Sequence, residues 1–192
     1  YLSAGGKFTF DGQLFLSDIE DEETGQGGFL DFEYNFRKGV KQRLGIEWAD
    51  DHVDINDMGF LVRNSYRQIR TAHSRTNSDL SWARTNEFDL RGFMQKNSDD
   101  LLSGATIFLS NRTTFQNLDQ FTIHMSYSPE SYDDLNSFGN GTYRIEEQSF
   151  LGLSYDSDGS QEFSYGLGLG VQEEHLGDDT LISRLSFSWR PN

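Results

Sequence analysis

The chain has 192 residues, with 16 Lys and Arg against 31 Asp and Glu, which gives a formal net charge of −15. The absence of cysteine excludes a disulfide-stapled scaffold, a zinc finger, an iron–sulfur centre and a thiol nucleophile. The negative charge argues against a general nucleic-acid binder, which needs a basic surface. The chain also has no run of about eighteen apolar residues, so the sequence predicts no transmembrane helix. The length favours a single domain, residues 1–192.

Apolar and polar residues alternate with a period of two along most of the chain, which predicts β-strands. The alternation is cleanest at Phe163, Tyr165, Leu167, Leu169 and Val171, where serine and glycine occupy the intervening positions. Residues 65–77 are poor in apolar side chains, and 141–155 alternate only in part. Ten strands are predicted in chain order: 4–16, 28–37, 40–49, 65–77, 83–95, 103–111, 119–128, 141–155, 161–173 and 180–190.

The predicted connections alternate in length and charge. Tight turns at 37–39 and 156–159 join neighbouring strands. The stretches 17–27, 50–64 and 129–140 are long and acidic. Short turns on one side and long loops on the other are typical of transmembrane β-barrels, and an even number of strands would place both termini on the periplasmic side.

Alternation by itself fits either a soluble β-sandwich or a membrane barrel. The predicted strand lengths match the roughly 9–11 residues that a tilted strand needs to cross a bilayer. The polar face is rich in charge and glycine, and aromatic residues gather near strand ends, at Phe36, Trp48, Tyr127, Tyr155 and Trp189. We therefore predict an all-β, antiparallel up-and-down transmembrane β-barrel of about ten strands, either complete or part of a larger barrel.

Residues 54–64, DINDMGFLVRN, end an acidic loop and precede a predicted strand. This stretch resembles an Asn-Asp-x-Gly-Phe-x-x-Arg-Asn/Asp pattern of a bacterial outer-membrane family, whose large members begin with a family-9-like carbohydrate-binding domain and end in a β-barrel domain of unknown function. The resemblance implies that this chain is the C-terminal part of a longer protein. It supplies no catalytic residues, because the family has no established reaction. By their chemistry, residues 56–61 suit a turn that tucks the loop against the barrel wall.

Two acidic loops carry ligands that suit Ca²⁺, namely residues 18–23 and the group Asp50, Asp51, His52, Asp54 and Asp57. We favour solvated, mutually repelling loops over metal sites. Asp156 and Asp158 resemble the start of a calcium loop, but no Glu follows at the required distance, so a turn is predicted. The histidines show no ligand spacing and no Gly-x-Ser-x-Gly elbow occurs. The sequence thus predicts no catalytic residues, no metal and no cofactor.

A local charge reversal is the strongest candidate for a binding site. Six arginines lie close together in an otherwise acidic chain: Arg63, Arg67, Arg70, Arg75, Arg84 and Arg91. If the lumen-facing members line one wall opposite the carboxylates of residues 28–49, a transverse field crosses the interior, orients polar solutes and selects ions. Structural ion pairs that brace a plugged barrel would explain the same residues equally well.

These features together predict a non-enzymatic, integral outer-membrane protein of a Gram-negative bacterium that acts in transport or in surface glycan binding and uptake. The expected partners are outer-membrane lipid, a polar solute or glycan, and an upstream domain or partner protein, but not nucleic acid. The alternative is a soluble or secreted β-sandwich that binds carbohydrate. A barrel-borne hydrolase has no supporting motif.

Overall fold

The computed structural model describes residues 2–4, 6–18, 23–53, 65–78, 80–137, 140–173 and 177–191, and every regular element there is a β-strand. The predicted all-β fold is confirmed. No helix in this part of the chain is long and apolar enough to span a membrane. The strands are β1 (Leu2–Ala4), β2 (Phe8–Ser17), β3 (Gly25–Arg37), β4 (Val40–Ala49), β5 (Tyr66–Ser78), β6 (Ala83–Asn97), β7 (Leu102–Phe115), β8 (Gln120–Ser128), β9 (Ser131–Asp133), β10 (Tyr143–Ile145), β11 (Gln148–Asp156), β12 (Phe163–Glu173) and β13 (Thr180–Trp189).

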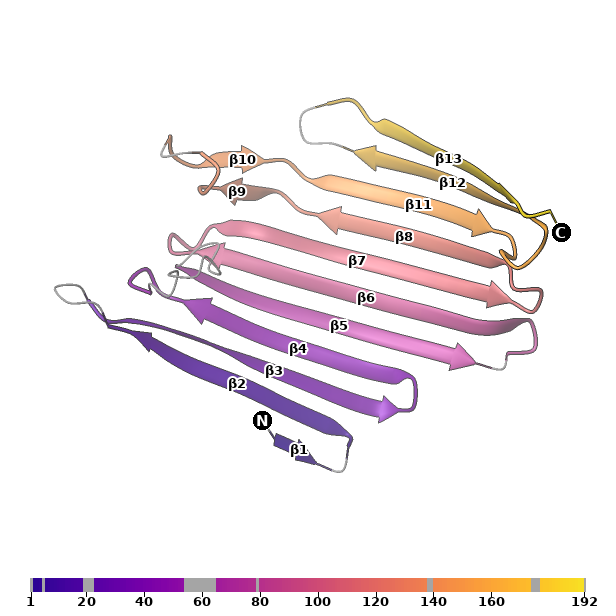
Figure 1. Cartoon of the computed structure of the whole chain (residues 1–192). Coiled ribbons are helices and arrows are strands. Elements are labelled where there is room, and N and C mark those ends of the chain that lie inside the picture. The colour runs from indigo at the N-terminus through magenta and orange to yellow at the C-terminus, as the bar shows by residue number, and fades with distance from the viewer. Residues whose placement is uncertain are drawn as a thin grey trace.

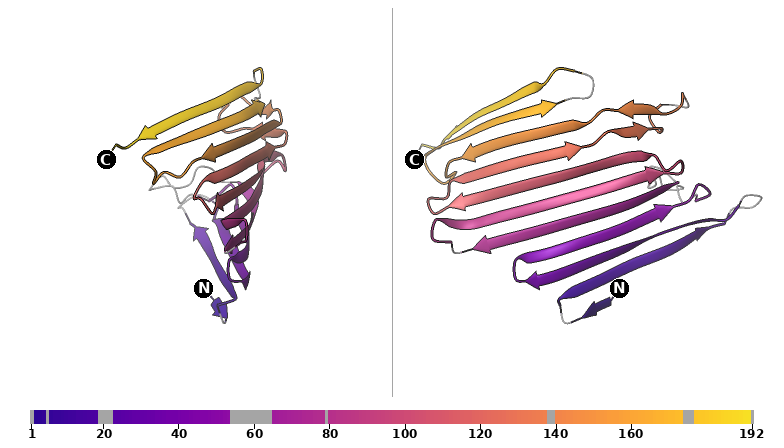
Figure 2. Two further views of the ribbon diagram at one scale, coloured as in Figure 1. Left: turned by 90° about the vertical axis from the view of Figure 1, so that its right-hand side faces the viewer. Right: turned by 180° about the vertical axis from the view of Figure 1, so that it is seen from behind.

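Eleven of these strands form one antiparallel sheet, in the order β1 to β8 followed by β11, β12 and β13 (Figure 1). Strands β9 and β10 pair with each other as a separate hairpin. Long strands that follow one another in the chain therefore lie side by side, which confirms the predicted up-and-down order. The sheet is open, because β1 and β13 lie at its opposite ends and no described strand joins them (Figure 2).

The ten predicted strands correspond to β2 through β8 and β11 through β13, with two differences. Residues 4–16 are not one strand, because Gly6 adopts a positive φ of 66° and turns Leu2–Ala4 back onto the start of β2. The prediction of a single strand over 141–155 is wrong as well. The chain leaves the main sheet after β8 and rejoins it at Gln148, and among the described strands β10 pairs only with β9.

The connections at the two ends of the strands differ in length, as the sequence indicates. Short connections join β3 to β4, β5 to β6, β7 to β8 and β11 to β12 at one end of the strands, which we call the short-turn edge, and β13 also ends there (Figure 1). At the opposite strand ends, which we call the loop edge, β2 is followed by β3, β4 by β5, β8 by the β9–β10 hairpin and β11, and β12 by β13. Two connections at the loop edge are exceptions: the one between β6 and β7 has four residues, and the one between β12 and β13 has six, as many as the connection between β11 and β12 at the short-turn edge.

One face of the sheet, which we call the apolar face, carries large hydrophobic side chains on every long strand. Residues directly opposite each other in antiparallel strands point to the same face, and the pairing aligns apolar rows such as Leu30, Ile46, Ile69 and Met94 across four strands. The exposed members of this face include Phe8, Phe10, Leu14, Leu16, Leu30, Phe32, Leu44, Ile46, Ile69, Met94, Ile107, Met125, Leu151, Leu153, Leu167, Leu169, Val171, Leu181, Leu185, Phe187 and Trp189.

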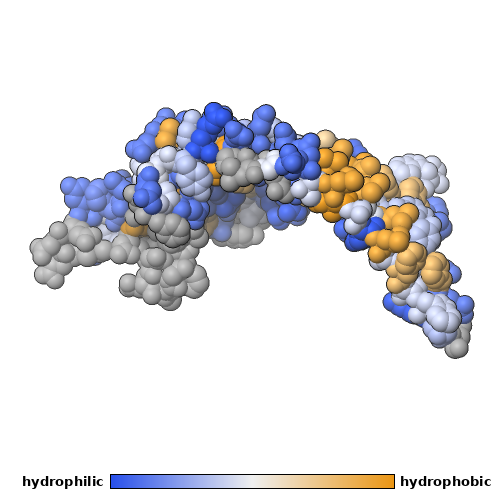
Figure 3. Space-filling model, turned by 90° about the horizontal axis from the view of Figure 1, so that it is seen from above, coloured by the Kyte–Doolittle hydropathy of each residue, from blue (hydrophilic) through white to orange (hydrophobic). Residues whose placement is uncertain are grey.

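The protein is a single curved layer rather than a globule around a core. Among the described residues, only three apolar side chains are fully buried, Ala49, Val53 and Ala83, and all three lie at or near strand ends. A space-filling view shows apolar residues gathered in the half of the molecule toward the short-turn edge, between polar residues at that end and at the loop edge (Figure 3). Burial of a large apolar side chain contributes roughly 1.5–3 kcal/mol to stability. The exposed side chains of the apolar face do not gain most of this stabilisation within the described structure.

Candidate polar binding face

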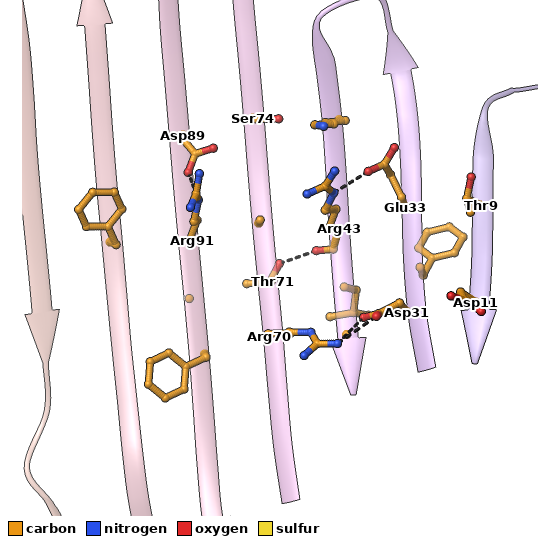
Figure 4. Close-up of a pocket in the computed structure, with 18 of the residues that line it drawn as sticks. Thr9, Asp11, Asp31, Glu33, Arg43, Arg70, Thr71, Ser74, Asp89 and Arg91 are labelled. Carbon is orange, nitrogen blue, oxygen red and sulfur yellow. Dashed lines mark hydrogen bonds and ion pairs between the residues drawn. The ribbon is translucent and has the colours of Figure 1, made fainter. Parts of the chain in front are cut away.

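The other face of the sheet, which we call the polar face, holds a hollow of about 870 Å³ over β2 to β7. Two rows of paired residues cross it (Figure 4). The first runs through Glu33, Arg43, Ala72, Arg91 and Phe108. The second is displaced by two residues along each strand and runs through Asp31, Gly45, Arg70, Phe93 and Thr106.

Arg70 braces three neighbouring strands. Its Nη2 donates to both carboxylate oxygens of Asp31 on β3, at 3.0 and 2.9 Å, and its Nη1 donates to Glu47 Oε2 on β4 at 2.9 Å. The arginine side chain reaches β3 by lying across Gly45 on the intervening strand. A Cβ at Gly45 would stand 2.5 Å from Arg70 Nε and 2.5 Å from Asp31 Oδ1. A side chain at this position would therefore force the Arg70–Asp31 ion pair to shift.

Arg43 and Arg91 are held differently from Arg70. Arg43 uses only Nε to donate to Glu33 Oε2, at 2.5 Å, and Arg91 uses only Nε to donate to the Asp89 carboxylate. Their Nη atoms make no hydrogen bond to the described residues. Both side chains are well exposed, at 59% and 66%. The two guanidinium groups lie on either side of β5, where the small side chain of Ala72 separates them (Figure 4).

Aromatic rings border the hollow on the side of β6 and β7. Phe93 and Phe108 belong to its lining. The Phe108 ring also stacks on His124 of β8, with centroids 5.9 Å apart and planes 25° from parallel. The hollow therefore combines ion pairs at one side with flat apolar rings at the other.

The six predicted arginines do not form one wall. Arg70 and Arg91 lie on the polar face and line the hollow. Arg67 pairs opposite Trp48 and Arg75 opposite Val40, so both lie on the apolar face, near the two ends of β5. Arg84 lies at an irregularity in the pairing at the start of β6, and Arg63 lies outside the described residues.

Short-range ion pairs account for the two predicted arginines on the polar face: Arg70 pairs with Asp31 and Glu47 on β3 and β4, and Arg91 pairs with Asp89 on its own strand. Arg43 was missed among the predicted site residues, and so were its partner Glu33 and the Arg91 partner Asp89. The period-two alternation places all three on the polar face, and that signal was sufficient to find them.

The acidic loops give weaker candidates. Asp50, Asp51 and His52 bring one ligand atom each within 4.8 Å of one another, and His52 also lies 3.3 Å from Glu23. This is an exposed acidic group of the kind expected for a solvated loop. Residues 54–64, which carry the family-like pattern, lie outside the described residues.

Hydrogen bonds order two connections that the sequence singled out. In the turn after β11, Asp158 accepts from Ser160 N, Ser160 Oγ and Gln161 Nε2 at 2.8–2.9 Å, which confirms a turn and lowers the pKa of Asp158, the Gln161 contact contributing most. In the β9–β10 hairpin, burial raises the pKa of Asp133, but hydrogen bonds from Asn136, Tyr143 and Leu135 outweigh it and lower that pKa to about 2.

The fold and the polar face together define a class of protein: a long up-and-down antiparallel sheet with one apolar and one charged face. A comparison with known protein families matches residues 3–191 to a domain of unknown function, DUF5916. The chain belongs to this family. No curated protein and no solved structure gives a significant match.

Proposed function

We propose that the chain forms the wall of an outer-membrane β-barrel, with the apolar face toward lipid and the polar face toward a water-filled interior that serves solute transport or glycan uptake, without catalysis. The observation that carries this proposal is the exposed apolar face. Soluble monomers rarely expose apolar patches of more than a few hundred Å². Here exposed apolar rows cross the whole sheet, and no described element covers them.

Strand length and direction support a lipid-facing wall. The ten long strands have between 9 and 15 residues, and a tilted strand crosses a bilayer with roughly 9–11. A β-sandwich, the alternative prediction, requires a second sheet to cover the first, and the only other sheet among the described residues is the short β9–β10 hairpin.

Aromatic residues on the apolar face support the same orientation. Rings gather at the short-turn edge, where Phe163 lies 6.0 Å from Phe187 and 6.4 Å from Tyr165, and Tyr34 lies 4.8 Å from Phe36. Trp189 pairs opposite Phe163 in the same band. Membrane barrels carry such aromatic girdles at the level of the lipid headgroups. The short-turn edge would then face the periplasm and the acidic loops the outside.

The open edges imply that the barrel is closed by other strands. Within the described part of the chain, β13 pairs only with β12, and β2 beyond Phe10 pairs only with β3. Unpaired backbone groups are costly in a bilayer, because no water is present to satisfy them. We propose that further strands complete the barrel, as in the C-terminal barrel domains that residues 54–64 resemble. Ten strands by themselves would enclose an interior largely filled by side chains.

Membrane fractionation tests this proposal. Cells that produce the protein are broken, and their membranes are washed with alkaline carbonate and then with urea. The protein is expected to stay in the pellet, to need detergent for extraction, and to migrate differently on a denaturing gel before and after heating. A protein that is monodisperse in buffer without detergent would overturn the proposal.

A further inference from the structure

We propose that the hollow on the polar face is a binding site for an uncharged, polyhydroxylated ring solute, that is, a pyranose sugar or a short chain of them. This inference deepens the proposed function and rests on it in one respect, because it assumes that the polar face lines an interior that solutes can enter. The argument uses the free hydrogen-bonding groups, the charge balance and the aromatic rings of the hollow.

Guanidinium donors that have no hydrogen-bond partner among the described residues lie next to carboxylate oxygens in this hollow. Each of the pairs Arg43–Glu33 and Arg91–Asp89 uses a single Nε contact, which leaves the guanidinium Nη atoms available beside carboxylate oxygens. A sugar hydroxyl both donates and accepts a hydrogen bond. Two neighbouring hydroxyls can therefore bridge an arginine and its carboxylate without breaking the ion pair.

The charge of the lining favours a neutral ligand over an ion. Four basic side chains, Lys41, Arg43, Arg70 and Arg91, stand against four acidic ones, Asp11, Asp31, Glu33 and Asp89. Arg70 also contacts Glu47, which adds one more negative charge beside the hollow. An anion would be attracted by the arginines but repelled by the adjacent carboxylates, and a cation would be attracted by the carboxylates but repelled by the arginines. A neutral polar solute experiences the local fields, which orient its hydroxyls, without a net Coulomb cost.

Aromatic rings supply the apolar contact that a sugar ring requires. Phe93 and Phe108 line the hollow next to Arg91, and the Phe108 ring lies nearly parallel to the His124 ring at 5.9 Å between centroids. The C–H face of a pyranose is apolar and packs on such rings, whereas a small inorganic anion gains nothing from them. The hollow of about 870 Å³ falls within the roughly 300–1,000 Å³ of small-molecule sites.

Calorimetric titration of the detergent-solubilised protein with maltotriose, an uncharged glucose trisaccharide, tests the inference, and saturation-transfer NMR on the same samples identifies the sugar protons in contact. We expect saturable binding. Arg91→Gln and Phe108→Ala should each weaken it by about fivefold, as the loss of one ordinary interaction does. Two control variants should leave binding unchanged: Arg112→Gln on β7, where Arg112 pairs opposite Glu87 on the polar face but does not line the hollow, and Phe187→Ala on the apolar face.

Each other outcome contradicts the inference in a recognisable way. Absence of maltotriose binding by protein whose circular dichroism shows intact strands would assign the hollow to structural bracing. Binding of glucuronate or inorganic phosphate without maltotriose would make it an anion site, and equal weakening by the control variants would place the sugar elsewhere. Membrane fractionation of the same protein is a separate readout, so that failure of the proposed barrel is distinguished from failure of the sugar site.

Discussion

Substitution of Leu153 by arginine places a charge at the middle of the apolar face. Leu153 is 42% exposed and lies between Ile123 on β8 and Leu169 on β12. Aromatic rows border this part of the sheet toward the short-turn edge, and the polar pair Ser149–Glu173 borders it toward the loops. If this face meets lipid, Leu153 lies near the centre of the bilayer.

Arginine on the lipid face of a membrane barrel costs about 2–4 kcal/mol at mid-depth. Because about 1.4 kcal/mol corresponds to a tenfold change in an equilibrium constant, Leu153→Arg should reduce the folding equilibrium in vesicles by about 30- to 1,000-fold. Urea or guanidinium titration of the protein in phospholipid vesicles, followed by tryptophan fluorescence, measures this change.

Ser154→Arg is the matched control, because the next residue along β11 points to the polar face. It pairs on one side opposite Gly168, which has no side chain to collide with the introduced arginine, and on the other side opposite Thr122, which is small. We expect a change within about 0.5 kcal/mol, as for an ordinary surface substitution. The reasoning is refuted if the two variants fold equally well, since lipid would then not distinguish the two faces.

Two further predictions concern glycines in close contacts, and a third concerns the titration of one carboxyl group. Gly45→Ala should destabilise the protein by about 1–3 kcal/mol in denaturant titration, because its Cβ collides with the Arg70–Asp31 pair; a similar loss in an Arg70→Ala background would contradict this cause. Gly25→Ala places a Cβ 2.3 Å from the His52 backbone and should destabilise by a similar amount, whereas Gly159→Ala, with nothing within 4 Å, should not. The Asp133 carboxyl should titrate in ¹³C NMR near pH 2 rather than 3.8. Because folding lowers this pKa, its stabilising contribution is complete above about pH 4 and is lost as the pH falls toward 2; a midpoint at 3.8 would show that the hairpin hydrogen bonds do not form.

The long strands were predicted correctly because their alternation is continuous. The predictions for residues 4–16 and 141–155 were wrong because a short local feature changes the direction of the chain there. The positive φ of Gly6 ends β1 and starts β2, although a glycine pair in an alternating stretch fits a strand equally well. The break at Glu146 and Glu147 was visible as imperfect alternation. The sequence did not show which strand pairs with residues 143–145, because the pairing of β10 with β9 depends on the geometry of the connection between them.

The arginine cluster shows the same division between local and tertiary information. Proximity in the sequence suggested one basic wall, but in a strand alternate side chains point to opposite faces. Arg70 therefore joins Asp31 and Glu47 on the polar face, while Arg67 and Arg75 point away from it. Arg43 is 27 positions from Arg70 in the sequence and yet lines the same hollow.

The sequence by itself determined the β-class, the positions of the long strands and the division into an apolar and a polar face, because a period of two fixes the side of every residue once strands form. It also determined which edge carries the acidic loops. Only the tertiary structure decided the register, and with it which charges meet, since a shift between strands changes every cross-strand neighbour. Register places Gly45 beneath Arg70 and Ala72 between Arg43 and Arg91. These small residues among longer side chains leave the hollow on the polar face.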